Sequence, residues 1–421
     1  MTASMSVTDR IEADYIIETA IDPHKAAETM AGEQSSGTFL PIPGETEELK
    51  ARSAARVEHL EIYETVDTPS LPGAAVGETY QRARVTLSWP LGNVGPSLPN
   101  LMATVSGNLF ELKPFSGLRV MDIRMPQAFA DAYAGPQFGI EGTRRLTGVS
   151  KGPLIGTIIK PSVGFSPEET AERVAILAQA GIDFVKDDEL QTDGPYCPFE
   201  DRVKAVMAVI NAHAEKTGKK VMYAFNLTGE VDEMRARHDL VRDLGGTCVM
   251  ASVNSVGLGG MIALSRHTQL PIHAHRNGWG YLSRHPMLGW SHVAWSKFWR
   301  LAGADHLHVN GLRNKFCEPD DSVIQSAQSL LTPLFDDKPC LTMPVFSSGQ
   351  SAIQPAETYR RMQTTDLIYA AGGGIVGHPD GIEAGVRSLR EAWDAAEQGI
   401  LAADYAKEHP ALARALDAYA Q

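Results

Sequence analysis

Short apolar runs that end in polar residues recur along the chain from residue 153 onward. Most are separated by segments with helical spacing, such as residues 166–180, where Ser166 and Glu169 have the spacing of a capping box. Eight strand–helix units of this kind over about 250 residues predict a (β/α)8 TIM barrel. A doubly wound open sheet is the alternative, because its strands also end in polar loops. The eight runs are PLIGTIIK (153–160), GIDFVKDD (181–188), VMYAFNLTG (221–229), TCVMASVN (247–254), LPIHAHR (270–276), DHLHVNG (305–311), CLTMPVFSSG (340–349) and DLIYAAGGG (366–374).

The N-terminal part of the chain has a different pattern. The segments DYIIETAI (14–21) and RARVTLSWP (82–90) alternate like half-buried strands, while ELKARSAARVEHLE (48–61) has helical spacing. A stretch rich in glycine and proline follows at residues 132–153. We therefore expect a smaller α+β domain of the ferredoxin-like type over residues 1–145, and a catalytic barrel domain with C-terminal helices over residues 146–421.

Composition and charge narrow the possible functions. The 421 residues carry a formal net charge of −13, with 51 acidic and 38 basic residues. This balance argues against broad binding to nucleic acid or to an acidic membrane, because both need clustered lysine and arginine. The sequence contains neither a signal-peptide pattern nor a long apolar run, and its four cysteines lack metal-site spacing. A cytoplasmic protein that binds a small molecule is expected.

Polar residues stand at almost every predicted strand end. In a TIM barrel these ends open into one shared mouth, however far apart the residues lie in sequence. The strand-end residues are Lys160, Lys186, Asp188, Glu189, Asn226, His273, His275, Arg276, His306, His308, Ser347, Ser348 and the glycines 372–374. The barrel therefore predicts one functional site built from many strands.

Three of these residues suggest a metal site. Asp188 and Glu189 offer hard oxygen ligands that suit Mg²⁺, but two carboxylates alone hold the ion poorly. Lys186 lies two residues before Asp188 and shares its face of the strand, although an ammonium group cannot bind a cation. An amine that has reacted with CO₂ to form a carbamate would supply the missing oxygen ligand.

The segment GIDFVKDDE (181–189) resembles the signature G-x-D-F-x-K-x-D-E of the large subunit of ribulose bisphosphate carboxylase (RuBisCO). The resemblance implies a carbamylated lysine at Lys186 and one Mg²⁺ per site, with Asp188 and Glu189 as the other ligands. Other segments are similar to this family from about residue 10 to residue 400.

The similar segments imply further roles at the barrel mouth. Lys160 in GTIIKPSVG and His275 in HAHR are implied in proton transfer, and Lys315 lies in the mobile sixth loop of the family. Arg276 and His308 are implied as contacts to phosphate or hydroxyl oxygens. Glycine turns let backbone N–H groups approach an anion closely. The resemblance accordingly implies phosphate contacts at Ser347, Gly349, Gly372 and Gly373.

The N-terminal domain also carries family segments. GEQSSGTF (32–39) and SGNLFELK (106–113) resemble the segments that supply Glu33, Thr38 and Asn108 to the site of a neighbouring subunit. The resemblance therefore implies a homodimer or a larger assembly with shared active sites, and a sugar phosphate as the small-molecule partner.

Several positions depart from the carboxylase pattern. Ser162 replaces the second lysine of a Lys-Pro-Lys motif, Ser348 replaces a glycine of the first phosphate turn, and Leu190 replaces an asparagine. Phe39 stands where the family has tryptophan. These changes argue against carboxylation of ribulose bisphosphate, and the chain is identified as similar to the RuBisCO-like proteins.

The implied chemistry is that of a metal-stabilised enediolate of a sugar phosphate. Because Lys160 and Lys315 are both present, the expected reaction is decarboxylation of 3-oxo-isoapionate 4-phosphate to L-erythrulose 1-phosphate and CO₂, in apionate catabolism. A transcarboxylase/hydrolase that forms 3-phosphoglycerate and glycolate from the same substrate is the first alternative. A methionine-salvage enolase or isomerase follows, and a non-catalytic sugar-phosphate sensor comes last.

Some polar residues have structural interpretations instead. Asp187 is expected to be structural or salt-bridged, because it lies beside a lysine in a buried strand. His273 and His306, each two residues before another histidine, are expected to be hydrogen-bonded supports rather than catalysts.

Overall fold

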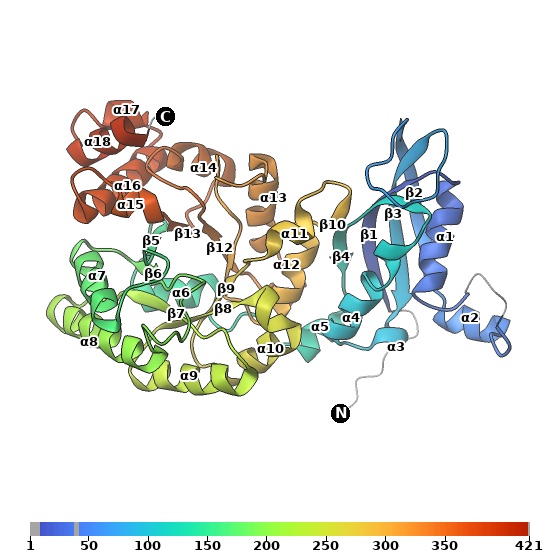
Figure 1. Ribbon diagram of the computed structural model, residues 1–421, viewed down its shortest axis with the longest axis horizontal. Coiled ribbons are helices and arrows are strands. Elements are labelled where there is room, and N and C mark those ends of the chain that lie inside the picture. Colours follow the sequence, from blue (N-terminus) through green and yellow to red (C-terminus); the bar gives the residue numbers. More distant parts are fainter. Residues whose placement is uncertain (1–8, 38–41, 420–421) are drawn as a thin grey trace. The chain divides into compact units, whose positions relative to one another are not determined.

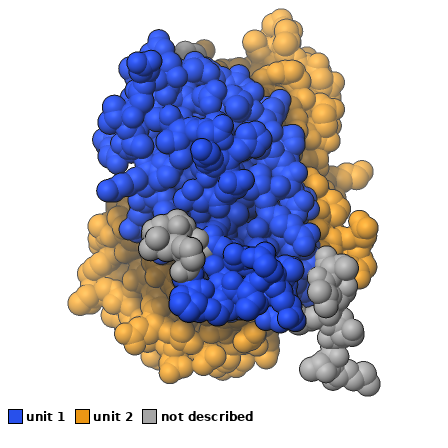
Figure 2. Space-filling model, turned by 90° about the vertical axis from the view of Figure 1, so that its right-hand side faces the viewer, with its two compact units in different colours: residues 1–134, 278–301 blue, residues 135–277, 302–421 orange. Residues whose placement is uncertain are grey.

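In the computed structural model, residues 9–37 and 42–419 are described, and they fall into two compact units (Figures 1 and 2). Unit 1 contains the described residues up to Ala134 together with Gly278–Leu301, and unit 2 contains Gly135–Asn277 and the chain from Ala302 onward. Residues 278–301, which were expected in the barrel domain, belong to unit 1, since their strand β10 pairs in parallel with β4. The boundary at residue 145 stays a prediction.

Unit 1 is built on a five-stranded sheet in the order β10-β4-β1-β3-β2, counted over the described residues. Strand β1 pairs antiparallel with both β3 and β4, and α1 and α4 follow β1 and β3, which is the ferredoxin-like arrangement expected from the sequence. The elements of unit 1 are β1 (Arg10–Thr19), α1 (Pro23–Glu33), α2 (Glu47–Ser53), β2 (Arg56–Val66), β3 (Tyr80–Pro90), α3 (Leu91–Val94), α4 (Leu98–Val105), the 3₁₀ helix η1 (Leu109–Glu111), β4 (Phe115–Arg124), α5 (Gln127–Ala132), α11 (Trp279–Ser283), β10 (Leu288–Trp290) and α12 (His292–Leu301).

Unit 2 is a closed barrel of eight parallel strands in the order β5 to β9 and then β11 to β13, among the residues with a described position. This confirms the TIM barrel and rules out the open sheet. Its strands are β5 (Leu154–Ile158), β6 (Phe184–Lys186), β7 (Met222–Asn226), β8 (Cys248–Ser252), β9 (Ile272–His275), β11 (His306–His308), β12 (Met343–Phe346) and β13 (Ile368–Ala370).

The helices of unit 2 follow the strands and cover the barrel (Figure 1). Helix α7 begins with the capping box expected from the sequence, in which Ser166 and Glu169 each bind the other's backbone N–H. The helices are α6 (Gly139–Thr147), α7 (Pro167–Gln179), α8 (Phe199–Thr217), α9 (Val231–Asp243), α10 (Val253–His267), α13 (Asp320–Leu330), α14 (Pro355–Met362), α15 (Gly372–Val376), α16 (Ile382–Glu397), α17 (Ala402–Tyr405) and α18 (Pro410–Tyr419).

The lower barrel core is apolar and follows the two-residue period of a strand. Alternate strand residues form one buried cluster, which includes Leu154, Phe184, Met222, Ala224, Cys248, Met250, Met343, Val345, Ile368 and Ala370. The next position on the same face of β6 is Lys186 and on β7 is Asn226. The inward face of these strands therefore changes from apolar to polar toward their carboxyl ends.

The opposite end of the barrel is closed by buried carboxylates. Asp305 accepts the backbone N–H groups of Phe138 and Gly139 at the start of α6, and that of Ile272 before β9. Burial raises the pKa of Asp305 to about 6, although these hydrogen bonds lower it. Such contacts fix the helices and strands relative to one another on the face that carries no catalytic strand ends.

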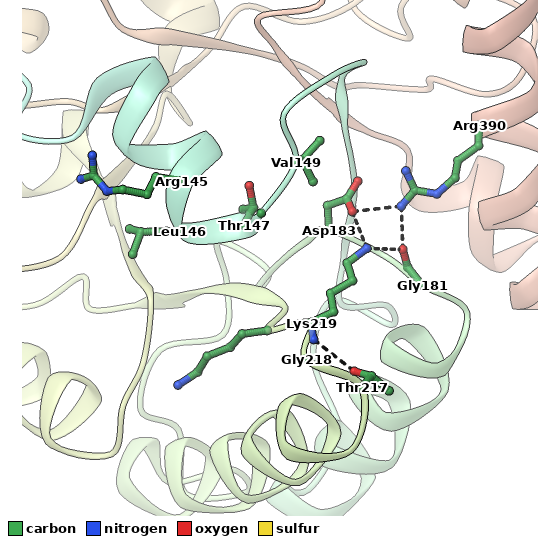
Figure 3. A pocket seen from close by; sticks show the side chains of 12 residues that line it. Arg145, Leu146, Thr147, Val149, Gly181, Asp183, Thr217, Gly218, Lys219 and Arg390 are labelled. Atoms are coloured by element: carbon green, nitrogen blue, oxygen red, sulfur yellow. Dashed lines mark hydrogen bonds and ion pairs between the residues drawn. The ribbon is translucent and has the colours of Figure 1, made fainter.

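A cavity of about 610 Å³ lies at the amino ends of β6 and β7 and is rich in basic residues (Figure 3). Lys219 and Arg390 bind Asp183 Oδ1 at 2.6 and 3.0 Å, and both also donate to the carbonyl of Gly181. Arg145 lies in the last turn of α6. Arg145 offsets the partial negative charge at the end of its helix, and Lys219 and Arg390 neutralise Asp183, so these cations have a structural explanation.

Among the described residues, we found no helix whose length and apolar character would let it cross a membrane.

Candidate active site at the barrel mouth

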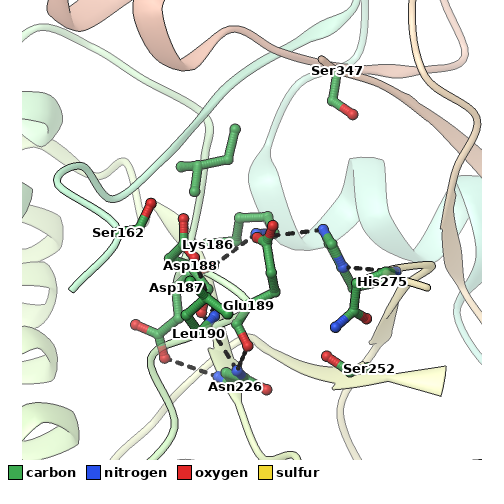
Figure 4. Close-up of polar contacts among 12 residues, drawn as sticks. Ser162, Lys186, Asp187, Asp188, Glu189, Leu190, Asn226, Ser252, His275 and Ser347 are labelled. Atoms are coloured by element: carbon green, nitrogen blue, oxygen red, sulfur yellow. Dashed lines mark hydrogen bonds and ion pairs between the residues drawn. The ribbon is translucent and has the colours of Figure 1, made fainter. Parts of the chain in front are cut away.

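The inward positions at the carboxyl ends of the strands form a single polar cluster in unit 2 (Figure 4). Five of these residues are the last of their strands: Lys186 of β6, Asn226 of β7, Ser252 of β8, His275 of β9 and His308 of β11. All five are buried or half-buried. The sequence prediction of one shared mouth agrees with this arrangement.

Lys186, Asp188 and Glu189 lie together at the end of β6. The Nζ atom of Lys186 donates to the carbonyl of Asp187 at 2.8 Å and lies 3.4 Å from Glu189 Oε2. Lys186 and Asp188 are almost inaccessible to solvent, whereas Glu189 is about one third exposed, at 32% of its side chain. The three side chains therefore lie together at the carboxyl end of the barrel strands, and Glu189 is the most exposed of them.

The electrostatics of this group are set by burial and by close opposite charges. Burial lowers the pKa of Lys186, although Glu189 and Asp188 oppose this shift. Burial raises the pKa of Glu189, but His275 and Lys186 outweigh it and bring the value down to about 2. Burial and Lys186 lower the pKa of His275 to about 4, so that its ring is neutral at pH 7. The buried lysine amine is thus shifted toward the form that can react as a nucleophile.

Lys160 lies at the same side of the mouth, two residues after β5. Its ammonium group contacts Asp188 Oδ2 at 2.6 Å and the hydroxyl of Ser162 at 2.8 Å. Ser162 stands where the carboxylase pattern has a second lysine. The structure therefore gives this departure a specific consequence, because the hydroxyl orients Lys160 instead of adding another charge.

Asp187 points away from the mouth and organises the layer between β6 and α8. Its carboxylate accepts the phenol of Tyr223 at 2.6 Å, the backbone N–H of Asn226 at 2.9 Å and the guanidinium of Arg202 at 3.2 Å. Asp187 and Arg202 are both fully buried. This confirms the expectation of a salt-bridged Asp187. Sequence reasoning gave no sign of Arg202 or Tyr223, since neither lies at a strand end.

A chain of hydrogen bonds connects histidines of β9 and β11 with Ser347, which directly follows β12. His308 Nδ1 lies 3.0 Å from Ser347 Oγ, and His308 Nε2 lies 2.8 Å from His273 Nε2. Burial lowers the pKa of both rings, and two facing nitrogen atoms then need one proton between them. His306 Nε2 binds Thr143 Oγ1 at 2.7 Å. Both His273 and His306 are therefore hydrogen-bonded, as expected, and their supporting role stays a prediction.

The first of the two expected phosphate turns lies against the segment that holds Lys315. The backbone N–H of Lys315 donates to Ser348 at 3.3 Å, and Gly349 adopts a left-handed conformation with φ +89°. Gly372 and Gly373 directly follow β13 at the start of α15, and no described atom lies within 4 Å of a side-chain carbon placed at Gly373. Backbone N–H groups at such turns are accessible to an anion.

Arg276 follows His275 at the end of β9, and its guanidinium is bound to a carboxylate. Its Nη2 atom donates to Glu318 Oε2 at 2.7 Å, and the side chains are only 6% and 13% exposed. Glu318 was not among the predicted site residues, because it lies in a loop rather than at a strand end.

The residues expected from the N-terminal domain belong to unit 1. Asn108 donates to Glu33 Oε1 at 3.4 Å, so these two side chains lie together. Thr38 lies outside the described residues. The expectation that these residues complete a neighbouring subunit's site stays a prediction.

A second group of possible metal ligands, His238, Asp239 and His267, lies on α9 and α10. The backbone N–H of Gln269 donates to His238 Nε2, so the neutral ring carries its proton on Nδ1, which donates to Asp239 at 3.0 Å. That nitrogen is therefore not available to a metal ion. This group is a hydrogen-bond network that joins two helices.

The residues at the barrel mouth fit Mg²⁺ better than the group of His238, Asp239 and His267 does. Asp188 and Glu189 provide hard oxygen atoms, and the amine of Lys186 is buried beside them with a lowered pKa. Three ligand-bearing side chains at the end of a barrel strand, surrounded by cations and histidines, define a candidate metal-assisted enzyme site.

Comparisons with known proteins identify the family. Residues 139–419 match the family "Ribulose bisphosphate carboxylase large chain, catalytic domain", and residues 8–129 match the corresponding N-terminal domain. The chain belongs to the RuBisCO large-chain family.

Two relatives and one solved structure are similar over nearly the full length. A protein of Xanthobacter autotrophicus named "3-oxo-isoapionate-4-phosphate transcarboxylase/hydrolase" is 58% identical, over 97% of this chain and 99% of the relative. A "3-oxo-isoapionate-4-phosphate decarboxylase" of Rhizobium rhizogenes is 47% identical, over 98% of each chain. The crystal structure of a RuBisCO-like protein from Burkholderia fungorum superposes with a TM-score of 0.92 at 45% identity, covering 97% of this chain and 99% of that chain.

Replacing Tyr223 by Phe should destabilise the protein through Asp187. The change removes one hydrogen bond to a fully buried carboxylate, which is worth roughly 1.5–3 kcal/mol. We expect this loss in the free energy of unfolding, measured by urea denaturation. Tyr369→Phe is the matched control, because Tyr369 is also buried but donates to a neutral carbonyl, that of Ser351. Its loss should be roughly 0.5–1.5 kcal/mol, and equal losses in the two variants would contradict the central role of Asp187.

Proposed function

We propose that this chain acts on 3-oxo-isoapionate 4-phosphate as a transcarboxylase/hydrolase and forms 3-phosphoglycerate and glycolate. The observation that supports this most is the 58% identity to the Xanthobacter protein with that name, over 97% of the chain. Decarboxylation to L-erythrulose 1-phosphate and CO₂, which the sequence favoured, is the second candidate. It is supported by the 47% identical Rhizobium protein.

Both reactions begin with cleavage of the same carbon–carbon bond. In a β-keto acid, the bond between the carboxylate and the neighbouring carbon breaks, and its electron pair is delocalised into the adjacent carbonyl group. The released carboxyl group then either leaves as CO₂ or is moved within the substrate before water cleaves a carbon–carbon bond. The candidates therefore differ after the first step, and the residues that start the reaction serve both.

Lys186, Asp188 and Glu189 would hold Mg²⁺ in this proposal. The bound ion would supply positive charge that offsets negative charge developing on neighbouring substrate oxygens. The amine of Lys186 would first attack CO₂ and release a proton, which leaves an anionic carbamate. Burial supports this step, because it lowers the pKa of Lys186 and so increases the neutral amine that can attack.

Lys160 and His275 are proposed to handle protons. Lys160 is held by Asp188 and Ser162 at 2.6 and 2.8 Å, and this contact keeps its ammonium group directed at the metal-ligand residues. His275 lies 3.5 Å from Glu189, and its pKa of about 4 leaves a neutral ring that can accept a proton at pH 7. The ammonium group of Lys160, a proton donor, and the imidazole of His275, a proton acceptor, thus both lie beside the proposed metal ligands.

The phosphate of the substrate is proposed to bind at the glycine turns. Ser347, Gly349, Gly372 and Gly373 would provide hydroxyl and backbone N–H donors, and Lys315 would provide a positive charge and contact the carboxylate that is broken off. Arg276 and His308 would bind further oxygens of the substrate, with His308 next to Ser347 at 3.0 Å. The proximity of Lys315 to Ser348 and Gly349 supports a common anion site.

The protein is proposed to work as a homodimer or larger assembly, with Glu33, Thr38 and Asn108 of one subunit completing the site of another. The hydrogen bond between Asn108 and Glu33 supports a joint role for those two residues.

The products of purified protein with Mg²⁺, bicarbonate and 3-oxo-isoapionate 4-phosphate will separate the two candidates. We expect the ³¹P NMR signal of 3-phosphoglycerate without release of CO₂, because the carboxyl group is retained in the transcarboxylase/hydrolase reaction. Erythrulose 1-phosphate with an equal amount of CO₂ would instead establish the decarboxylase. The absence of any reaction would refute both.

Replacing Lys186 by Met should abolish turnover, because the amine that forms the carbamate is lost. We expect the rate to fall at least about a hundredfold, the scale of losing one electrostatic group in an active site. In ¹³C NMR with labelled bicarbonate, the wild-type protein should give a carbamate signal that the variant lacks.

Lys204→Met is the control, since Lys204 is an exposed residue of α8 that is paired with Glu200. It should keep both the activity and the carbamate signal. A Lys186→Met protein that remains active would rule out the carbamate mechanism.

Sedimentation of the purified protein should give at least a dimer, because the proposed site takes residues from two subunits. A protein that is monomeric and fully active would contradict the shared site.

A further inference from the structure

Glu318 neutralises the arginine at the mouth of the barrel. Its Oε2 atom accepts Arg276 Nη2 at 2.7 Å and Asn310 Nδ2 at 2.6 Å, and its Oε1 atom accepts the hydroxyl of Ser322 at 2.9 Å. Three residues therefore fix this carboxylate from three sides. Because Arg276 is buried and Glu318 is only 13% exposed, the pair is a fixed part of the mouth rather than a transient surface contact.

The contact that orients Asn310 comes from the first phosphate turn. Ser348 Oγ donates to Asn310 Oδ1 at 2.9 Å, which directs the amide N–H of Asn310 toward Glu318. Ser348 adopts φ 71°, a left-handed conformation that glycine adopts without strain. The serine at this position therefore has a backbone cost, and its hydroxyl holds the residue that binds Glu318.

The charge balance of the mouth follows from these pairs. Lys160 is paired with Asp188, Lys186 lies against Glu189, and Arg276 is paired with Glu318. Among the described mouth residues, Lys315 forms no ion pair, and it lies beside Ser348 and Gly349. A phosphate ester carries nearly two negative charges at pH 7 and needs cationic or N–H donors. The mouth therefore has one lysine available for such a group.

We propose that Glu318 restricts the mouth to ligands with a single phosphate by occupying Arg276. The proposal rests on the proposed function, in which the substrate is a sugar-acid monophosphate, and it identifies the residue that sets this substrate class. A second phosphate at Arg276 would have to displace a carboxylate held by three donors, or lie beside its negative charge. Uncharged hydroxyl groups meet no such repulsion, so they can bind at that end.

The test measures binding of two unreactive probes, erythritol 4-phosphate and ribitol 1,5-bisphosphate, by calorimetry with protein, Mg²⁺ and bicarbonate. The wild-type protein should bind the monophosphate at least about tenfold more tightly than the bisphosphate, which is the scale of one charge-assisted contact. In Glu318→Gln, the affinity for the bisphosphate should rise about tenfold or more, because the negative charge beside Arg276 is removed. The affinity for the monophosphate should change less than about threefold, since its phosphate is proposed to bind the glycine turns and not Arg276.

Two further variants make the result specific. Ser348→Gly removes the hydroxyl that orients Asn310 and suits the local backbone, so it should shift the preference in the same direction by a smaller factor. Glu357→Gln removes an equal charge from the exposed pair with Arg360 on α14, and it should leave the preference unchanged.

Equal binding of the two probes by the wild-type protein would overturn the proposal. An unchanged preference in both Glu318→Gln and Ser348→Gly would overturn it as well. Because both probes are unreactive, this result is independent of turnover. A failure to convert 3-oxo-isoapionate 4-phosphate would contradict the proposed function and would not alter the binding result.

Discussion

Strand β6 ends at a buried lysine, and the next two residues are buried aspartates, in an interior where ionised groups need partners that water cannot provide. Asp187 satisfies this constraint on the outer side of the strand, through the buried guanidinium of Arg202 and the phenol of Tyr223. This anchoring fixes the backbone on either side, so that Lys186 and Asp188 can face the mouth. The position of the candidate metal ligands depends on a carboxylate that is not one of them.

The two-residue period of the strands explains why so much of the mouth could be predicted from the sequence. An apolar run ending in a polar residue identifies both the strand and its end, and the barrel brings those ends together. Lys186, His275 and His308 were found in this way. The period fails for residues that act from helices or from loops, because their partners depend on tertiary packing. Arg202 on α8 and Glu318 before α13 are such residues, and only the structure connects them to the site.

The same reasoning applies to the departures from the family pattern. From the sequence, Ser162 and Ser348 are only missing family residues, and they weaken the comparison with the carboxylases. In the structure, both hydroxyl groups form contacts of their own, to Lys160 and to Asn310. Each substitution replaces a family residue with a hydroxyl that orients a charged or polar neighbour. Both serines therefore take part in a hydrogen-bond network of the mouth, and the departures are more than the loss of family residues.

This network also bears on how two chemistries can share one substrate. The proposed reactions start with the same bond cleavage, and the residues at the ends of β5, β6 and β9 that would start it are grouped around one carboxylate pair. The two reactions would differ only afterwards, when the reactive carbon takes up a proton in one and the carboxyl group is moved within the substrate in the other. In the proposed function, that choice would follow from how long the mouth retains CO₂ and excludes water. Glu318 contacts Arg276, directly after β9, while Asn310 and Lys315 contact Ser348, two residues after β12. The loop after β11 is thus held against the neighbouring strand ends, so its packing would bear on the outcome as directly as the strand-end residues do.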